Sequence, residues 1–265
     1  MIDIHSHIIY SIDDGSQSLD MSLEMLRMSV NSGVTDIIAT PHVNRQGKIP
    51  EWAEIEDKAE TLRQAAAKEN IPIHIYTGAE IELNGDVLRF LTGDKRDYCL
   101  AHSHYVLLEL TEQSQPEFVE PLLYEIQMRG YYPILAHVER FPILTHHPER
   151  LLRWLKKGML AQCNTGSFTG YFGSTLQGYV RDFYRNHMIH FLGSDGHRVE
   201  FRTTDINDAH AELDRLKKET KNSQDLWQAA THNAEFILKD KVLYPDLPDH
   251  WQKEKKGFFS RLFGR

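Results

Sequence analysis

The sequence begins with Met1-Ile2-Asp3-Ile4-His5-Ser6-His7, and the later motifs of the chain are interpreted together with this stretch. Ile2 and Ile4 alternate with polar neighbours, as in a short strand with one buried face. His5 and His7 come at the end of that strand, and a period of two points both imidazoles to the same side. Such a pair alone is a weak indication of a metal site, because it is more often solvated or hydrogen-bonded. Its weight depends on which residues lie at the ends of the later strands.

Length and composition limit the classes of protein to which the chain can belong. The 265 residues fit one α/β barrel of ordinary size. Hydrophobic residues make up 41% and charged residues 26%, which allows a large core and argues against bulk disorder. The formal net charge of -8 argues against a general nucleic-acid binder.

The two cysteines exclude a thiol-based phosphatase. Cys99 and Cys163 form no C-x-x-C pair, so neither a thiolate zinc site nor a disulfide framework is expected. A cysteine nucleophile of that kind needs an arginine six positions later, where this chain has Tyr105 and Thr169. We also expect a cytoplasmic protein, because the sequence has neither a secretory signal pattern nor an apolar run of transmembrane length.

Strand and helix patterns alternate along the chain. Seven strands are expected near 2–4, 36–40, 73–77, 105–110, 133–136, 159–163 and 189–192. Helices are expected near 19–30, 51–69, 116–128, 148–157, 175–186, 205–219 and 224–238. This alternation predicts a parallel sheet with right-handed crossovers, either open or closed as a barrel.

The strand ends favour the barrel. Nearly every expected strand ends at a metal-ligand residue type: His5 and His7, His42, Glu80, Glu109, His137, Asn164, and Asp195 with His197. A closed barrel gathers these ends around one axis, which is where barrel active sites lie, whereas an open sheet spreads them apart. Histidines that begin or precede strands should lie at the opposite end and be structural; these are His74, His102, His104 and His190.

Nine residues are therefore candidate metal ligands: His5, His7, Asp14, His42, Glu80, Glu109, His137, Asp195 and His197. They offer nitrogen and oxygen and no sulfur, a mixture that suits Mn, Fe or Zn. Nine groups exceed the ligands of one ion, so two or three ions are implied. A single strand-end polar residue often only caps a loop, but the whole set is much harder to explain in that way.

Five motifs carry a family resemblance. The opening D-x-H-x-H, the T-P-H at 40–42, Glu80, the A-H-V-E-R at 136–140 and the S-D-G-H at 194–197 resemble, in order, the polymerase-and-histidinol-phosphatase (PHP) superfamily. Over residues 1–240 the chain is most similar to its bacterial manganese-dependent protein-tyrosine phosphatases of capsule and exopolysaccharide clusters. The resemblance implies a distorted (β/α)7 barrel with its active site at the C-terminal ends of the strands.

The same resemblance implies the metal assignment and the substrate. It places His5, His7, Glu80 and Asp195 on one ion, Glu80, Glu109 and His137 on a second, and Asp14, His42 and His197 on a third. The implied cofactor is manganese. The implied activity is removal of phosphate from phosphotyrosine of a membrane-associated bacterial tyrosine kinase and its substrates, in the regulation of capsule and exopolysaccharide synthesis.

Two arginines are candidates for binding the phosphate. Arg140 lies three residues beyond His137, and Arg202 lies beyond His197. A guanidinium fork matches phosphate oxygens, although either residue can instead form a surface salt bridge. Clustered cations would supply a hydroxide nucleophile and neutralise charge in an in-line transition state.

Other functions fit the same ligands. A PHP phosphatase acting on a small molecule such as histidinol phosphate would use a nearly identical set. A nuclease-like PHP domain fits an acidic chain less well. A metal-dependent binding protein without turnover is the alternative from another class.

Residues 241–265 are predicted to form a tail outside the phosphatase domain of residues 1–240. From Lys253 the tail has five positive charges and one negative, and its Phe258, Phe259, Leu262 and Phe263 can share one helical face. Basic and aromatic residues together predict contact with a membrane surface or a partner, and a solvated tail is the alternative.

Overall fold

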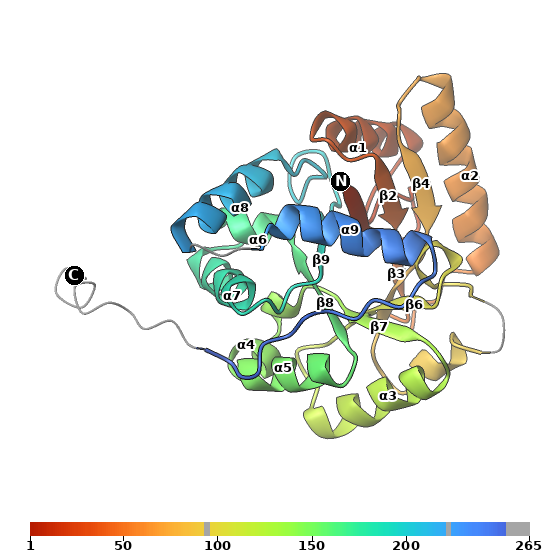
Figure 1. Ribbon diagram of the computed structural model, residues 1–265. Coiled ribbons are helices and arrows are strands. Elements are labelled where there is room, and N and C mark those ends of the chain that lie inside the picture. Colours follow the sequence, from red (N-terminus) through yellow and green to blue (C-terminus); the bar gives the residue numbers. More distant parts are fainter. Residues whose placement is uncertain (93–95, 221–223, 253–265) are drawn as a thin grey trace.

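A computed structural model describes residues 1–92, 96–220 and 224–252 of the chain. Strands lie at the centre and helices surround them (Figure 1). One parallel sheet has the order β1-β2-β4, and a second has the order β3-β5-β6-β7-β8-β9. The strands are β1 (Ile2–Ser6), β2 (Asp36–Ala39), β3 (His42–Val43), β4 (His74–Thr77), β5 (Glu80–Glu82), β6 (Tyr105–Glu109), β7 (Tyr132–Leu135), β8 (Leu160–Asn164) and β9 (Phe191–Gly193).

Two of the seven expected strands, 36–40 and 73–77, are each followed by a second short strand that was not expected. Pro41 separates β2 from β3, because proline has no N–H to give to a strand ladder. Gly78 and Ala79 separate β4 from β5, and a Cβ on Gly78 would lie only 2.9 Å from Leu100 Cδ2. The second strands, β3 and β5, pair with His42 opposite Glu80, so they bring two predicted ligands side by side.

The two sheets join at β1 and close the barrel. The Asp195 N–H donates to the His5 carbonyl at 2.8 Å, and the His7 N–H donates to the Gly196 carbonyl at 2.9 Å. A Cβ on Gly193 would lie 2.6 Å from His5 Cβ, so this close approach requires glycine. The expected distorted barrel, rather than an open sheet, is therefore confirmed.

A β-bulge in β1 points the histidines into the barrel. Asp3 pairs with Ile37, but Ser6 pairs with Ala39, so β1 has one extra residue between these two pairs. Ile4 packs in the barrel with residues such as Leu107, Ile134 and Phe191. Strict alternation would turn His5 away from that interior. The extra residue turns it inward, above the apolar layer.

The main helices agree with the sequence prediction to within about two residues at each end. They are α1 (Leu19–Asn31), α2 (Trp52–Lys68), α3 (Pro116–Met128), α5 (Pro148–Lys156), α7 (Ser174–Arg185), α8 (Asn207–Thr220) and α9 (Leu226–Leu238). Short helical turns are η1 (Val87–Arg89), η2 (Leu100–His102), η3 (Val138–Arg140), α4 (Pro142–Thr145) and α6 (Thr165–Thr169). Among the described residues, none of these helices is both long and apolar enough to cross a membrane.

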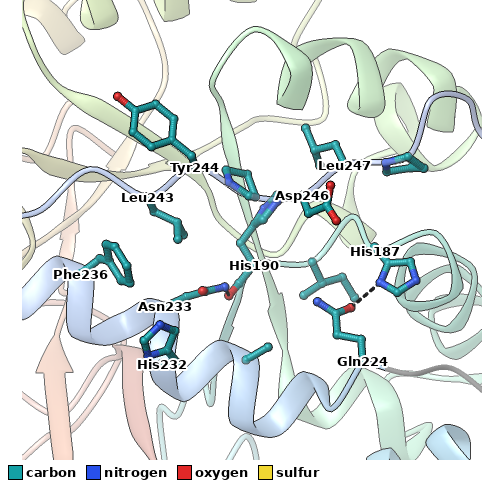
Figure 2. Close-up of a pocket in the computed structure, with 14 residues that line it drawn as sticks. His187, His190, Gln224, His232, Asn233, Phe236, Leu243, Tyr244, Asp246 and Leu247 are labelled. Carbon is teal, nitrogen blue, oxygen red and sulfur yellow. Dashed lines mark hydrogen bonds between the residues drawn. The ribbon is translucent and has the colours of Figure 1, made fainter.

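Helix α9 and the segment after it cross the amino end of the barrel (Figure 1). The Tyr105 hydroxyl donates to the Lys241 carbonyl at 2.6 Å, and Asn186 bonds the backbone of Gln252 at 2.8 and 3.0 Å. Between this segment and α9 lies a cavity of about 680 Å³, shown in Figure 2 with His190 in its wall. A domain boundary at residue 240 stays a prediction. The basic and aromatic residues 253–265 lie outside the described part of the chain.

Candidate metal centre

All nine predicted ligands meet at the carboxyl end of the barrel. Each of them lies within 4 Å of another member of the set through a ring nitrogen or a carboxylate oxygen. Most are fully buried, whereas Asp14 is 54% and Glu109 14% exposed, so the cluster opens to solvent on their side. The strand-end prediction is therefore correct about which residues come together.

Three ligand atoms, from His5, His7 and Glu80, form one compact group, and an Asp195 oxygen lies next to it. His5 Nε2 lies 3.2 Å from His7 Nε2, and each of these nitrogens lies 3.3 Å from Glu80 Oε2. Asp195 Oδ1 lies 3.6 Å from the His5 nitrogen and 3.4 Å from the His7 nitrogen. Ligands about 2.0–2.1 Å from a tetrahedral ion lie about 3.3–3.4 Å from one another. The spacing of the His5, His7 and Glu80 atoms fits a single cation, and Asp195 Oδ1 lies beside the two histidines of this group.

Several of these buried atoms have no hydrogen-bond partner among the described residues. They include Glu80 Oε2, Asp195 Oδ1, His42 Nδ1 and His197 Nε2. Leaving such groups without a partner costs about 1–3 kcal/mol each, and more when they are charged. A cation bound by these nitrogens and oxygens would remove that cost, so the donor set fits a metal such as Mn, Fe or Zn.

Two further groups border the first. His7, Asp14, His42 and His197 offer ligand atoms within 4.8 Å of one another, and so do His42, Glu80 and Glu109. His137 Nε2 lies 2.7 Å from Glu80 Oε1 and 3.7 Å from Glu109 Oε1. His42 thus lies beside the Glu80–Glu109 pair as well as beside Asp14. How the ligands divide among individual ions stays a prediction.

Burial and neighbouring charges together set the protonation of the cluster. Burial lowers the pKa of His137 and of His197 to about 4, whereas at His5 and His7 burial is outweighed by neighbouring carboxylates, which raise the pKa of both rings. His137 and His197 are therefore neutral near pH 7, which is the form that binds metals. Burial and the neighbouring Glu80 raise the pKa of Glu109 to about 8, because two carboxylates this close repel each other. A bound cation would reverse that repulsion.

Asp13 orients His7, a role that the sequence analysis missed. Its Oδ2 accepts a hydrogen bond from His7 Nδ1 at 2.7 Å and another from the His42 N–H at 2.9 Å. Burial opposes charge on both groups, but the pair holds the pKa of Asp13 at about 2 and that of His7 well above its usual value. The raised pKa means that His7 is protonated on both nitrogens in the metal-free protein. A bound cation would displace the proton of Nε2, and the carboxylate that accepts from Nδ1–H would then leave Nε2 as the ligand atom.

Two amides of β8 support the other ligands. Gln162 Oε1 accepts the His137 N–H at 2.8 Å and lies 3.2 Å from His5 Nδ1. Asn164 Nδ2 donates to Asp195 Oδ2 at 2.7 Å. The sequence identified Asn164 as a strand-end residue but did not predict its hydrogen bond to Asp195. No sequence pattern distinguished Gln162.

Three arginines lie at the cluster. Arg140 Nη1 and Arg202 Nη2 lie 3.3 and 2.6 Å from Asp195 Oδ2, so both predicted arginines are in place beside a ligand. Arg45, which was not predicted, contacts His42 Nε2 and lies 3.2 Å from Asp14 Oδ2. Its position three residues after the candidate ligand His42 is the feature of the sequence that could have predicted this contact.

The four histidines assigned to the amino end each have a local partner, and for His102 this is Glu56, whose Oε1 lies 3.4 Å from the His102 Nε2. His104 Nδ1 lies 2.9 Å from Asp240 Oδ1, and His74 Nδ1 lies 3.2 Å from Asp36 Oδ1. His190 Nδ1 accepts the Ala161 N–H at 3.0 Å. Because Nδ1 accepts, His190 carries its proton on Nε2. These contacts are structural, as expected.

Relatives of the chain are phosphatases by name. Tyrosine-protein phosphatase YwqE of Bacillus subtilis (strain 168) is 34% identical over 260 residues, which cover 98% of this chain and 100% of that protein. Putative tyrosine-protein phosphatase CapC of Staphylococcus aureus is 26% identical, covering 97% and 99%. Tyrosine-protein phosphatase CpsB of Streptococcus pneumoniae is 29% identical, covering 92% and 100%.

Solved structures agree with the fold. One from a study of YwqE and CpsB, described as unique metal-dependent tyrosine phosphatases, has a TM-score of 0.86 and 33% identity, covering 96% of this chain and 100% of that one. Histidinol phosphate phosphatase of Lactococcus lactis has a TM-score of 0.51 and 16% identity, covering 83% and 93%, which is a likeness of fold alone. The family model for capsular polysaccharide synthesis, CpsB/CapC, matches residues 1–239. The chain therefore belongs to the CpsB/CapC family of capsular polysaccharide synthesis.

Proposed function

We propose that the protein is a metal-dependent phosphatase that removes phosphate from phosphotyrosine in proteins of capsule or exopolysaccharide synthesis. The observation that carries the proposal is the group of ligand atoms of His5, His7 and Glu80, which are spaced for one cation at the carboxyl end of the barrel with Asp195 beside them. The names of relatives that match over the whole length of the chain supply the substrate class.

We propose two or three ions, with manganese as the native metal and iron or zinc as alternatives. The proposed ligands are His5, His7, Asp14, His42, Glu80, Glu109, His137, Asp195 and His197. When bound, such ions lower the pKa of water toward neutrality and neutralise charge on phosphoryl oxygens.

Arg140 and Arg202 are proposed to bind and orient the phosphate. Both guanidinium groups lie beside Asp195, so they flank one side of the cluster. The backbone of Arg202 is fixed, because its N–H donates to the Tyr171 hydroxyl at 3.1 Å and its carbonyl accepts the His197 N–H at 2.7 Å. The guanidinium of Arg202, carried on this backbone, can donate hydrogen bonds to two phosphate oxygens at once.

The chain has no need of a covalent phosphoenzyme. Both cysteines are buried, and burial raises the pKa of Cys99 to about 12 and that of Cys163 well above its usual value. Neither thiol is a nucleophile near pH 7. The leaving phenol of phosphotyrosine has a pKa of about 10, so it departs with less acid assistance than an alkyl alcohol.

The proposed partner is a bacterial tyrosine kinase together with its substrates, met at the cytoplasmic side of the membrane. Support comes from the five basic residues and four large apolar residues of segment 253–265. Such a segment is suited to an anionic membrane surface.

The test uses metal-stripped protein with Mn, Zn, Fe or Mg restored separately. Hydrolysis of a phosphotyrosine peptide should return with metal, be lost in His5→Ala, and exceed hydrolysis of histidinol phosphate. His74→Ala at the amino end is the matched control and should behave as wild type. Equal rates on histidinol phosphate would favour the small-molecule phosphatase instead, and metal binding without hydrolysis would favour a non-catalytic protein.

A further inference from the structure

A tight turn after β3 presents two cations beside the metal centre. Within residues 44–48, Asn44, Gln46 and Gly47 have positive φ of 67°, 53° and 76°. The Asn44 N–H donates to the Lys48 carbonyl at 2.8 Å, and the Lys48 N–H donates to the Arg45 carbonyl at 3.0 Å. Left-handed residues other than glycine persist only where the surroundings hold them. The turn therefore has a defined conformation that its surroundings hold in place.

The end of β5 anchors this turn. Asn44 Nδ2 donates to Asn84 Oδ1 at 2.6 Å and contacts the Glu82 carbonyl at 3.3 Å. Asn44 itself is buried, although the turn it begins projects from the barrel. The side chains of Arg45 and Lys48 are therefore displayed from a fixed backbone.

The turn lines a cavity of about 420 Å³ that adjoins the candidate ligands. Arg45, Gln46 and Lys48 line one part of it, and Ile12 and Pro50 supply apolar surface. The candidate ligands Asp14 and His42 also line it, so the cavity is continuous with the site of the proposed reaction.

The net charge of this cavity becomes positive when hydrogen bonds occupy Asp13 and a metal ion is bound by Asp14. Asp13 also lines it, but its oxygens already accept from His7, Gly15 and His42. Asp14 pairs with Arg45, and Asp14 is a proposed metal ligand. Arg45 also contacts His42 Nε2, a second proposed ligand. A cation held by Asp14 and His42 would repel the guanidinium, which would leave Arg45, with the exposed Lys48, available to an anion in the cavity.

We propose that this cavity binds an acidic side chain that neighbours the phosphotyrosine in the substrate. This inference rests on the proposed function and specifies its substrate class. The Arg45 fork matches a carboxylate, Lys48 adds a second positive charge, and the apolar surface of Ile12 and Pro50 packs the methylene stem of a glutamate. The nearby cavity thus selects among phosphotyrosine sites by their sequence.

The test compares phosphotyrosine peptides that carry glutamate or the uncharged glutamine at each of the three positions on either side. With manganese-loaded full-length protein, kcat/KM should be about threefold to tenfold higher for glutamate at one or two positions. Lys48→Gln should reduce that ratio toward one, and Lys48→Glu should reverse it. A peptide with a second phosphotyrosine at the preferred position distinguishes preference for a carboxylate from preference for any anion.

Lys58→Gln is the matched control, because the Lys58 ammonium is held by the Ser11 carbonyl at 2.9 Å and Glu54 at 2.8 Å. It should keep the wild-type ratio. Dissociation constants of matching peptides with a phosphonate that cannot be hydrolysed measure the same preference without turnover. Equal values for glutamate and glutamine in both measurements would overturn the inference and leave the proposed hydrolysis standing. A preference in binding without any hydrolysis would support the inference and overturn the proposed function.

Discussion

The two ends of the barrel contain similar histidines and carboxylates but arrange them in opposite ways. At the amino end, imidazoles meet single partners: His104 meets Asp240, His74 meets Asp36, and His190 meets a backbone N–H. At the carboxyl end, imidazoles and carboxylates converge in groups. Several buried atoms of these groups keep no hydrogen-bond partner among the described residues, whereas of the three amino-end histidines only His190 has such an atom, Nε2.

This difference separates stability from function. A histidine with one carboxylate is a local contact that helps to fix the chain. A cluster in which His5, His7 and Glu80 converge, with Asp195 beside the two histidines, holds unsatisfied groups in the metal-free protein. The fold keeps such a cluster because strands and turns fix each member independently, and a bound cation offsets its cost.

The largest effect should follow from Glu80→Gln. Glu80 contacts four imidazoles and belongs to two of the candidate ligand groups, so the amide removes charge from both groups at once. We expect kcat/KM on a phosphotyrosine peptide to fall on the order of 10³-fold, because metal stabilisation of the transition state amounts to several kcal/mol. Steady-state kinetics with manganese in excess, together with metal content by mass spectrometry, measures this.

Asp240→Asn provides the matching change at the amino end. It weakens the contact with His104 and should lower the free energy of unfolding by about 1 kcal/mol while leaving kcat/KM within about twofold. If Glu80→Gln kept the wild-type kcat/KM, or if Asp240→Asn greatly reduced it, the division of roles between the two ends would be wrong.

A smaller effect should follow from Asp13→Asn. The asparagine keeps the size of the side chain but presents N–H groups or a neutral oxygen to His7 Nδ1, which weakens the hold on the tautomer that leaves Nε2 free. We expect manganese affinity to fall about 10- to 100-fold, measured by calorimetric titration of the metal-free protein. Asp36→Asn changes the equivalent carboxylate beside His74 at the amino end and should leave the affinity unchanged. Equal losses in both variants would show that the effect is a general loss of structure.

The sequence predicted the site well because strand ends are a local property. The residues near the expected strand ends, with Asp14 from the turn after the first strand, are the nine that the structure brings together, and strand polarity placed His74, His104 and His190 at the other end. Their role as metal ligands stays a prediction. These inferences needed only the periodicity and the rule that parallel strands share a carboxyl end.

The features that the sequence did not predict depend on contacts between distant segments. The bulge in β1 is visible only from its pairing with β2, and the role of Gln162 requires its closeness to His137, 25 residues earlier. Asp13 and Asp14 are adjacent and chemically alike, and only the fold shows that Asp13 bonds His7 whereas Asp14 faces His42 and His197. Arg45 depends likewise on the turn that brings it back to Asp14.

The last prediction concerns pH and tests whether the amino end serves only stability. Burial lowers the pKa of His190 to about 3, so in the folded protein the ring stays neutral in mild acid. The unfolded chain takes up this proton below a pKa of about 6.5, so acid favours unfolding, and stability is lost as the pH falls from about 6.5 toward 3. For this one group the loss between pH 7 and pH 5 should be about 2 kcal/mol.

His190→Asn isolates that proton. Its side-chain oxygen can accept the Ala161 N–H in place of Nδ1, but it does not titrate. Urea unfolding at pH 7 and pH 5 should therefore show a drop in stability about 2 kcal/mol smaller than in wild type. His190→Leu, which loses the acceptor as well, should be less stable at pH 7 yet share the reduced pH dependence. Wild-type pH dependence in both variants would mean that other groups cause the acid sensitivity, whereas a change in kcat/KM at pH 7 in the asparagine variant would show that the two ends are coupled.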